Sequence, residues 1–480
     1  MNDRRAALHF SNRLRQLFRG ATNTLTMDWR TNKTYFFAGL LLLLTTFVVV
    51  VYYVNNPQPY VGPDSFEYIA NAQRIAAHGQ FVDPHRLPGF PLLIVLVFTL
   101  AGQGNMMAIS IANGILFILA TLEIYVIALL VLQRSWVAFL LGLLVGTNVV
   151  LLSFVKPIGS EALALWLVVT LALVAVLFAR TLRIRYLWLV MACMLTLILT
   201  RLEWSYLPVP LFAYLVLVAT RQGSTLRRPL LHALASVFLI YAVLGGYIFI
   251  NATQNHFMGI SDIQNINELG KVIQYNMQNE APSQYATIAQ TTNTFRSRGD
   301  INPYDLLEQH PELKDTHFAL VGTYAQSIIE HHPVEFLAKS VPVLFSSLDY
   351  FYYESEVDPH GLLARPLFGM DFVFHVLYKL NLGFPLVAAA WIFLLCWRRT
   401  TRLLSVQAMG ILLLVVLYGI VMTTLGGYSS YIRFHTPFNP LLIVILWGSV
   451  LAGLLLIVRP GSPASTPEVS TAPREFVGRT

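Results

Sequence analysis

Asp64, Arg86 and Arg433 are the residues of this chain whose types and settings best suit chemistry. Asp64 follows a Gly-Pro pair at a predicted helix start, where its side chain could cap the free amides of the first turn. Arg86 and Arg433 each stand shortly before a proline that opens an apolar run. A carboxylate can accept a proton, and the planar fork of arginine suits phosphate. The pattern therefore predicts an acid and cation site at the mouths of apolar segments.

The segments that must position these side chains are strongly apolar. Of the 480 residues, 56% are hydrophobic and 12% are charged, which is about half the charge content of a soluble domain. Apolar runs near the roughly 20 residues that a bilayer core requires recur through most of the chain. We therefore expect an all-α polytopic membrane protein. The net charge of +7 falls mostly in short loops between these runs, so it does not indicate a nucleic-acid partner.

Ten apolar runs are expected to cross the membrane. The first is too long for a signal-peptide core and no small-residue cleavage site follows it, so we expect a retained anchor. The expected spans are Tyr35–Val54, Asn105–Leu132, Trp136–Phe154, Glu161–Ala179, Tyr186–Thr200, Trp204–Thr220, Leu230–Ile250, Asp371–Trp397, Leu403–Leu425 and Pro437–Val458.

One further apolar run, Pro88–Ala101, is short, and the arginines of the loops indicate where it lies. If this run does not cross, the basic loops and the C-terminal tail all face the cytoplasm, whereas a crossing would move them outside, against the positive-inside rule. We therefore expect a re-entrant or interfacial helix, in a multi-pass protein of the plasma (cell inner) membrane with both termini in the cytoplasm. The basic loops carry Arg134, then Arg180, Arg183 and Arg185, then Arg221, Arg227 and Arg228, then Arg398, Arg399 and Arg402.

The same topology divides the chain into five parts. Polar material lies mainly between the seventh and eighth spans, where two short helices are expected at Asn267–Gln278 and Leu320–Leu348. The parts are a basic cytoplasmic N-terminus (1–34), a transmembrane module (35–250) with its first external loop (55–104), an external loop or lid region (251–370), C-terminal transmembrane helices (371–458) and a cytoplasmic tail (459–480).

Neither a nucleotide-binding motif nor a metal motif accompanies this architecture. The sequence has no Gly-rich phosphate loop, HExxH or CxxC, and Cys193 and Cys396 both fall inside apolar runs. His78, His85 and His435 lack a second histidine at metal-ligand spacing, so we expect loop or interface residues. Chemistry on the outer face would therefore need an activated substrate that arrives through the membrane.

Four stretches, taken in order, carry a family resemblance. The first is Pro63-Asp64-Ser65-x-x-Tyr68, with Gly79 and then Arg86-Leu87-Pro88-Gly89-Phe90-Pro91-Leu92-Leu93. The others are Ser160-Glu161-Ala162-Leu163, Leu199-Thr200-Arg201-Leu202-Glu203 with Leu202 in place of a usual proline, and Tyr431-Ile432-Arg433-Phe434-His435-Thr436-Pro437. Together they resemble the GT-C glycosyltransferases, and more narrowly the branch of the protein O-mannosyltransferases and the lipid A aminoarabinose transferase. The resemblance covers about 35–458, without the external region 255–369.

This resemblance implies an inverting transfer of a sugar from a polyprenyl-phosphate donor to a lipid, glycan or protein acceptor. Attack through an oxocarbenium-like transition state needs a base, whereas a lipid phosphate leaves without a proton. In the family the first-loop aspartate is that base, a position that Asp64 holds. The other implied roles are a second acid (Glu161), donor-phosphate ligands (Arg86, Arg433, Arg201, Lys156) and substrate-pocket residues (Glu67, Tyr68, Tyr431). The family includes metal-dependent and metal-independent members, so a divalent cation stays open and no metal ligand is assigned.

Each of these residues also has a structural interpretation. Asp64 could simply cap its helix, and Glu161 could pair with Lys156. Glu67 could orient Arg74, hold a metal or lie on a solvated helix face. Snorkelling towards the membrane interface would explain the arginines, and an interfacial aromatic belt would explain the tyrosines, Tyr428 included.

Two other classes of function remain open at this point. A flippase or transporter of lipid-linked saccharides would need ionisable residues in mid-span, of which Glu123 is the clearest. A non-catalytic assembly protein with a decayed GT-C fold would not need Asp64, Arg86 and Arg433 together.

Overall fold

Helices form all the regular structure in the part of the chain that the structure describes. The computed structural model describes residues 32–348, 357, 360–361, 363–397, 403–428 and 431–458. The N-terminal segment, the C-terminal tail and the loop with Arg398, Arg399 and Arg402, which we expected in the cytoplasm, fall wholly or largely outside these residues. Apolar composition and length together explain the architecture, because a chain in lipid must satisfy its backbone groups internally. The all-α polytopic membrane class is thus confirmed.

In the part of the chain that the structure describes, six helices are long and apolar enough to cross a bilayer. A bent pair, with a 53° angle at its break, would make a seventh. The six are α2 (Asn32–Asn55), α5 (Met106–Leu132), α8 (Glu161–Thr181), α11 (Arg227–Asn255), the Ala364–Cys396 unit that contains α17 (Ala364–Lys379) and α18 (Phe384–Cys396), and α19 (Leu404–Gly426). The bent pair is α6 (Ser135–Gly146) and α7 (Val149–Val155).

The expected count of about ten spans is not confirmed. Three expected spans are not among these helices, and they correspond to α9 (Ile184–Ile198), α10 (Pro208–Arg221) and α21 (Asn439–Val458). Their cores are nevertheless apolar and pack into the bundle, since α9 contacts α8 and α21 contacts α19. Length explains the difference for α9 and α10, because their 15 and 14 residues rise only about 1.5 Å each, whereas α21 has 20 residues.

The short run after the first external loop forms α4 (Gly89–Ala101), which packs against α3 (Pro63–His78). Its 13 residues span about 20 Å, less than the roughly 30 Å of a bilayer core, in agreement with a helix that does not cross. The Gly89 amide donates to the carbonyl of Leu199, 2.8 Å away. This bond docks the start of α4 on the end of α9.

A side chain at position 89 is expected to undo this docking. A Cβ there would overlap Thr200 Oγ1 and lie 2.8 Å from the Leu199 carbonyl oxygen. We expect Gly89→Ala to lower the unfolding temperature in detergent, at a cost of about 1–3 kcal/mol for the forced displacement. Gly39→Ala in α2, where a Cβ meets nothing within 4 Å, is the matched control and should change little. Equal behaviour of the two variants would contradict close packing at Gly89.

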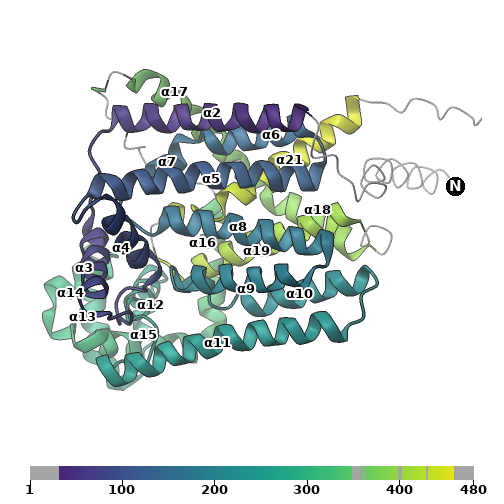
Figure 1. The fold of residues 1–480 in the computed structure, drawn as a ribbon. Coiled ribbons are helices and arrows are strands. Elements are labelled where there is room, and N and C mark those ends of the chain that lie inside the picture. Colours follow the sequence, from purple (N-terminus) through teal and green to yellow (C-terminus); the bar gives the residue numbers. More distant parts are fainter. Residues whose placement is uncertain are drawn as a thin grey trace, which may run out of the picture.

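Polar helices gather at one end of the bundle. Figure 1 shows α3, α4 and the helices of the external region at the end opposite to the start of α2 and the α10–α11 connection. The helices of the external region share a second apolar core, which is separate from the main core to which α3 and α4 belong. They are α12 (Ile263–Gln274), α13 (Ala286–Ser297), α14 (Pro303–Gln309), α15 (Ala319–His331) and α16 (Pro333–Leu348). Our prediction of two helices here was incomplete, because α13 and α14 are short and polar and Pro333 separates α15 from α16.

Candidate active site

The first turn of α3 presents the Asp64 carboxylate to its surroundings. The N-cap is Gly62, not Asp64, and Pro63 occupies the first helical position, where a missing amide costs nothing. The Ser65 hydroxyl accepts from the Gly62 amide (3.0 Å) and donates to the Ile158 carbonyl (2.7 Å). The expected capping role of Asp64 is therefore wrong, because neighbouring residues complete the turn and leave its side chain available.

Asp64 bridges two arginines that are far apart in sequence. Its Oδ1 lies 2.7 Å from Arg86 Nη2, and its Oδ2 lies 2.7 Å from Arg433 Nη2. Burial raises the pKa of Asp64, but the charges and hydrogen bonds of Arg86 and Arg433 outweigh it and hold the pKa below its ordinary value. The carboxylate is therefore ionised, and each of its oxygens is engaged by a guanidinium.

Arg86 is positioned by a turn and by an aromatic ring. Asp83 Oδ1 accepts from the backbone amides of His85 (2.8 Å) and Arg86 (2.7 Å), the local bonding that aspartate favours in turns. The Arg86 Nε then donates to Glu67 Oε2 at 2.6 Å. Its guanidinium lies 5.0 Å from the ring centre of Tyr68, within the range of a cation–π contact. These contacts place Arg86 between two carboxylates of α3.

Arg433 joins the Asp64 cluster to a second, more deeply buried acid. Its Nε donates to Oε1 of Glu161, the first residue of α8, whose side chain is only 4% exposed. Arg201 Nη1 lies 3.7 Å from the same oxygen, while Arg201 Nε pairs with Glu203 at 2.7 Å. We call the seven residues Asp64, Glu67, Tyr68, Arg86, Glu161, Arg201 and Arg433 the acid–arginine cluster. The structure brings all seven together from α3, the loop after it, α8, the end of α9 and α20 (Tyr431–His435).

The other two expected site residues are bound elsewhere. The buried Lys156 donates to the Gln58 carbonyl at 2.5 Å and lies 5.9 Å from the Tyr53 ring centre. The hydroxyl of Tyr431 contacts Lys271 Nζ (2.7 Å) and Gln274 Oε1 (2.8 Å) of α12. The structure pairs Glu161 with arginines, and Tyr431 ties α12 to the segment that carries Arg433.

His85 and Asp262 extend the cluster into the external region. His85 Nδ1 lies 2.7 Å from Asp262 Oδ1, and its Nε2 lies 3.3 Å from Glu67 Oε1. Burial lowers the pKa of His85, but the bonds to Asp262 and Glu67 prevail and raise it to about 9. Sequence reasoning missed Asp262 because it lies 177 residues from His85 and no motif marks it. A protonated His85 thus links the first loop to the polar helices.

This link predicts a loss of stability at alkaline pH. Because the folded pKa of His85 lies above its ordinary 6.5, its contribution is fully present below pH 6.5 and is lost as the pH rises through about 9. We expect the unfolding temperature to fall between pH 7 and 10, with a free-energy change on the order of 1–3 kcal/mol. His85→Gln should flatten this part of the profile, and His78→Gln, at an exposed histidine at the end of α3, should not. An unchanged slope in His85→Gln would argue against the link.

One group of side chains in the described residues has metal-ligand spacing, and it does not belong to the acid–arginine cluster. The ligand atoms of Glu280, His332 and Glu335 lie within 4.8 Å of one another. Lys339 Nζ, 2.6 Å from Glu335 Oε1, already supplies a positive charge there. Within the cluster itself the carboxylate oxygens of Asp64 face guanidinium groups, a setting that favours exchange of anions over capture of a divalent cation.

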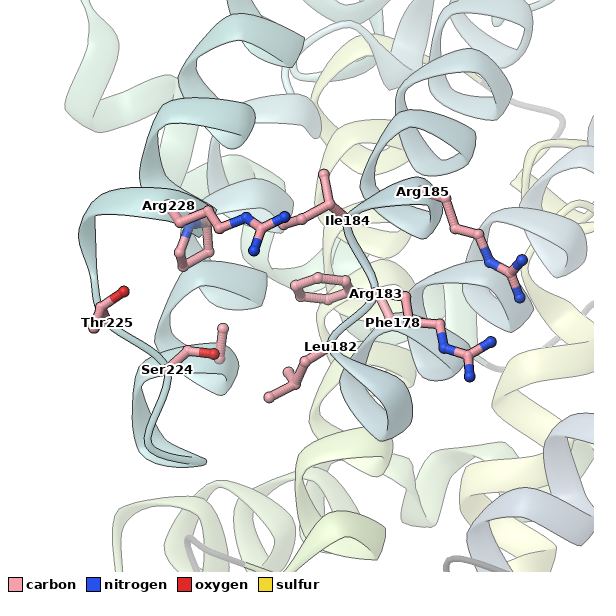
Figure 2. Close-up of a pocket in the computed structure, with 10 residues that line it drawn as sticks. Phe178, Leu182, Arg183, Ile184, Arg185, Ser224, Thr225 and Arg228 are labelled. Carbon is pink, nitrogen blue, oxygen red and sulfur yellow. The ribbon is translucent and has the colours of Figure 1, made fainter.

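A second candidate area lies at the other end of the bundle. A cavity of about 550 Å³ is bordered by the α8–α9 and α10–α11 connections. Figure 2 shows Arg183 and Arg185 extending away from Ser224 and Thr225. Both arginines and Arg228 are exposed. Their charge agrees with the basic loops on which the predicted orientation rests, and none of them contributes to the acid–arginine cluster.

The mid-span acid that a transporter would use is bound within a helix pair. Glu123 of α5 accepts from Trp166 Nε1 (3.1 Å) and from Thr170 Oγ1 (2.8 Å), both on α8. These bonds satisfy the polar group inside the apolar bundle. Glu123 therefore has a structural explanation that needs no transported substrate.

No protein-family model matches the chain, and no curated protein matches it in sequence. Among solved structures, the oligosaccharyltransferase AglB from Archaeoglobus fulgidus, in complex with an inhibitory peptide and a dolichol-phosphate, is 12% identical, with a TM-score of 0.49 over 89% of this chain and 52% of that chain. The apo form of the Archaeoglobus fulgidus oligosaccharyltransferase is 13% identical, with a TM-score of 0.47 over 88% of this chain and 51% of that chain. ArnT from Cupriavidus metallidurans bound to undecaprenyl phosphate is 14% identical, with a TM-score of 0.34 over 89% of this chain and 81% of that chain.

These structural neighbours belong to the GT-C superfamily, the one that the first-loop motif resembles. The chain spans about half the length of the oligosaccharyltransferase chains that it matches. Because the identities and scores are low, the functional interpretation rests on the acid–arginine cluster.

Proposed function

We propose that this protein is a membrane glycosyltransferase that moves a sugar from a polyprenyl-phosphate donor to an acceptor hydroxyl, with Asp64 as the general base. One observation carries the proposal: a single carboxylate lies between two guanidiniums, beside helices long enough to cross a bilayer. The acid can accept the proton of the acceptor, and the arginines can hold the departing phosphate. Both requirements of the reaction are thus met within one cluster.

The charges of the cluster support an exchange of partners when the donor binds. Four carboxylates (Asp64, Glu67, Glu161 and Glu203) already pair with the three arginines, so each guanidinium has an anionic partner. An incoming phosphate must therefore displace a carboxylate from an arginine. Asp64 is the suitable one, because it contacts both Arg86 and Arg433 and its side chain is 34% exposed. Glu161 is only 4% exposed, and Glu67, although 43% exposed, contacts Arg86 and not Arg433.

This exchange would also make Asp64 a better base. In the absence of donor, the two arginines keep its pKa low, and a carboxylate of low pKa accepts protons poorly. Once Arg86 and Arg433 turn to the phosphate, the stabilisation of the ionised form falls and the pKa rises. The donor would thereby activate the group that its own reaction needs.

The proposed step balances as a single displacement. The acceptor oxygen attacks the anomeric carbon from the face opposite to the phosphate, and its proton passes to the Asp64 carboxylate. The bond between the anomeric carbon and the phosphate oxygen breaks with its electron pair on the lipid phosphate, which Arg86 and Arg433 hold. Attack from the opposite face inverts the anomeric configuration.

We further propose that the cluster faces the outside of the plasma (cell inner) membrane and that both termini lie in the cytoplasm. The start of α2 and the basic α8–α9 and α10–α11 connections lie at the end opposite to the cluster (Figure 1). Basic loops remain in the cytoplasm during insertion. A lipid-linked donor can reach such a site without a soluble nucleotide sugar.

The proposal is tested by transfer in membranes. Vesicles with the wild-type protein receive undecaprenyl phosphate linked to a radiolabelled sugar, and label is followed into lipid, glycan and protein fractions. We expect label to move into one fraction, with release of undecaprenyl phosphate, and vesicles without the protein to show neither. Translocation of intact donor across the membrane without cleavage would instead favour the transporter function.

A further inference from the structure

The first turn of α14, in the external region, lies beside the acid–arginine cluster. Asn302, which caps this helix, accepts from the Tyr304 amide (3.2 Å) and from the Tyr428 hydroxyl (2.9 Å). Tyr428 follows the end of α19, in the connection that leads to Arg433. Its ring packs on Gly270 of α12, where a Cβ would lie 2.6 Å from Tyr428 Cγ. One hydrogen bond therefore ties the N-cap of α14 to the segment after α19, and the packing on Gly270 ties α12 to the same segment.

Two consecutive side chains of this turn remain available. Leu306 and Leu307 are buried in the core of the external region and fix the inner face of α14. Tyr304 is 43% exposed, and Asp305 is exposed and forms no ion pair or side-chain hydrogen bond with the described residues. Asp305 stands in the first turn, where an acid interacts favourably with the helix dipole, but the packing of the helix does not explain the exposed Tyr304.

Two observations relate Tyr304 to the proposed reaction centre: Asn302, two residues earlier, bonds at 2.9 Å to Tyr428 in the segment that leads to Arg433, and charges of the cluster act on Tyr304. Burial raises the pKa of Tyr304 to about 12, and the charges that act on it are those of Arg86, Asp64, Glu67 and Arg433. Burial, followed by the charges of Tyr304, Asp305 and Asp64, likewise raises the pKa of Tyr428. Tyr304 is therefore close to four residues of the cluster while part of its ring is accessible.

This pair of side chains suits a sugar. A sugar ring has an apolar face of C–H groups, which packs on an aromatic ring, and hydroxyl groups, which donate to a carboxylate. In the proposed function the arginines take the phosphate, and α14 belongs to the external region that borders the cluster through Tyr428. The part of a donor that extends beyond its phosphate is the sugar.

We infer that the first turn of α14 holds the sugar of the lipid-linked donor, with the ring of Tyr304 against its apolar face and Asp305 accepting from its hydroxyls. This inference rests on the proposed function and assigns to the external region a role in donor selection. Tyr304 and Asp305 would then discriminate between lipid-linked sugars, while the arginines bind the phosphate common to all of them.

The experiment compares binding of lipids that differ only in the sugar. Purified full-length protein in detergent is titrated with undecaprenyl phosphate and with undecaprenyl phosphate carrying mannose, glucose or arabinose. For wild type, at least one lipid-linked sugar should bind more tightly than the bare lipid. Tyr304→Ala should weaken the binding of that lipid-linked sugar about five- to tenfold and leave the affinity for undecaprenyl phosphate unchanged. Tyr304→Phe should resemble wild type, because the ring remains.

The outcomes separate this inference from the proposed function. If none of the three sugars adds affinity in wild type, or if Tyr304→Ala weakens bare and sugar-linked lipid equally, α14 does not hold the sugar. Failure of wild type to bind undecaprenyl phosphate at all would instead refute the proposed function. Glu308→Gln, at an exposed carboxylate one turn further along α14, is the matched control, and Asp305→Asn should show a smaller, sugar-dependent loss.

Discussion

Asp64→Asn is expected to lose sugar transfer by about 10²- to 10⁴-fold, the usual contribution of a general base, and yet to bind undecaprenyl phosphate more tightly than wild type. The first effect follows because an amide cannot accept the proton of the acceptor. The second follows because Arg86 and Arg433 lose the anion that competes with the phosphate. Transfer is measured in vesicles with labelled donor, and binding with purified protein.

The opposite signs of these two effects make the variant informative. A carboxylate with a purely structural role would lower transfer and phosphate binding together, because the arginines would lose their position. Asp300→Asn, at an exposed acid of the external region, is the matched control and should leave both unchanged. Retention of transfer in Asp64→Asn would eliminate Asp64 as the base.

Arg433→Gln is expected to have the second largest effect, on both stability and transfer. The change removes the partner of Glu161, whose side chain is 4% exposed and would keep only Arg201 at 3.7 Å. Loss of one partner of a buried ion pair costs about 3–5 kcal/mol. Because the Arg433 side chain is itself 37% exposed, we expect the lower part of that range. The unfolding temperature and labelled-donor transfer should both fall.

A double variant separates these two consequences. Glu161→Gln combined with Arg433→Gln removes both charges, so its unfolding temperature should exceed that of Arg433→Gln alone. Transfer should remain lost, since no guanidinium is left at this position to hold the phosphate. Arg433→Lys keeps the positive charge but loses the planar guanidinium that can bind phosphate through two N–H groups. Its unfolding temperature should therefore be closer to that of wild type than its transfer activity is. A double variant as unstable as the single one would show that Glu161 and Arg433 are not coupled.

Within the described residues, part of the architecture and most of the proposed site were predictable from local patterns. Apolar runs fixed by bilayer thickness predicted the membrane helices and the short α4. The settings of Asp64, Arg86 and Arg433 at the mouths of apolar runs predicted an acid and cation site, and the family resemblance added Arg201. The count of spans was less certain, because α9 and α10 are shorter than the usual crossing length.

The amino-acid sequence by itself thus determined the membrane class and the residue types available for chemistry, because hydropathy and helix length act locally along the chain. Only the tertiary structure decided which charges meet: that both oxygens of Asp64 are held by arginines and that Glu161 pairs with Arg433. These pairings join residues up to 369 positions apart. Contacts between residues so far apart in the sequence are set by the packing of the helices and of the external region, which no local pattern determines.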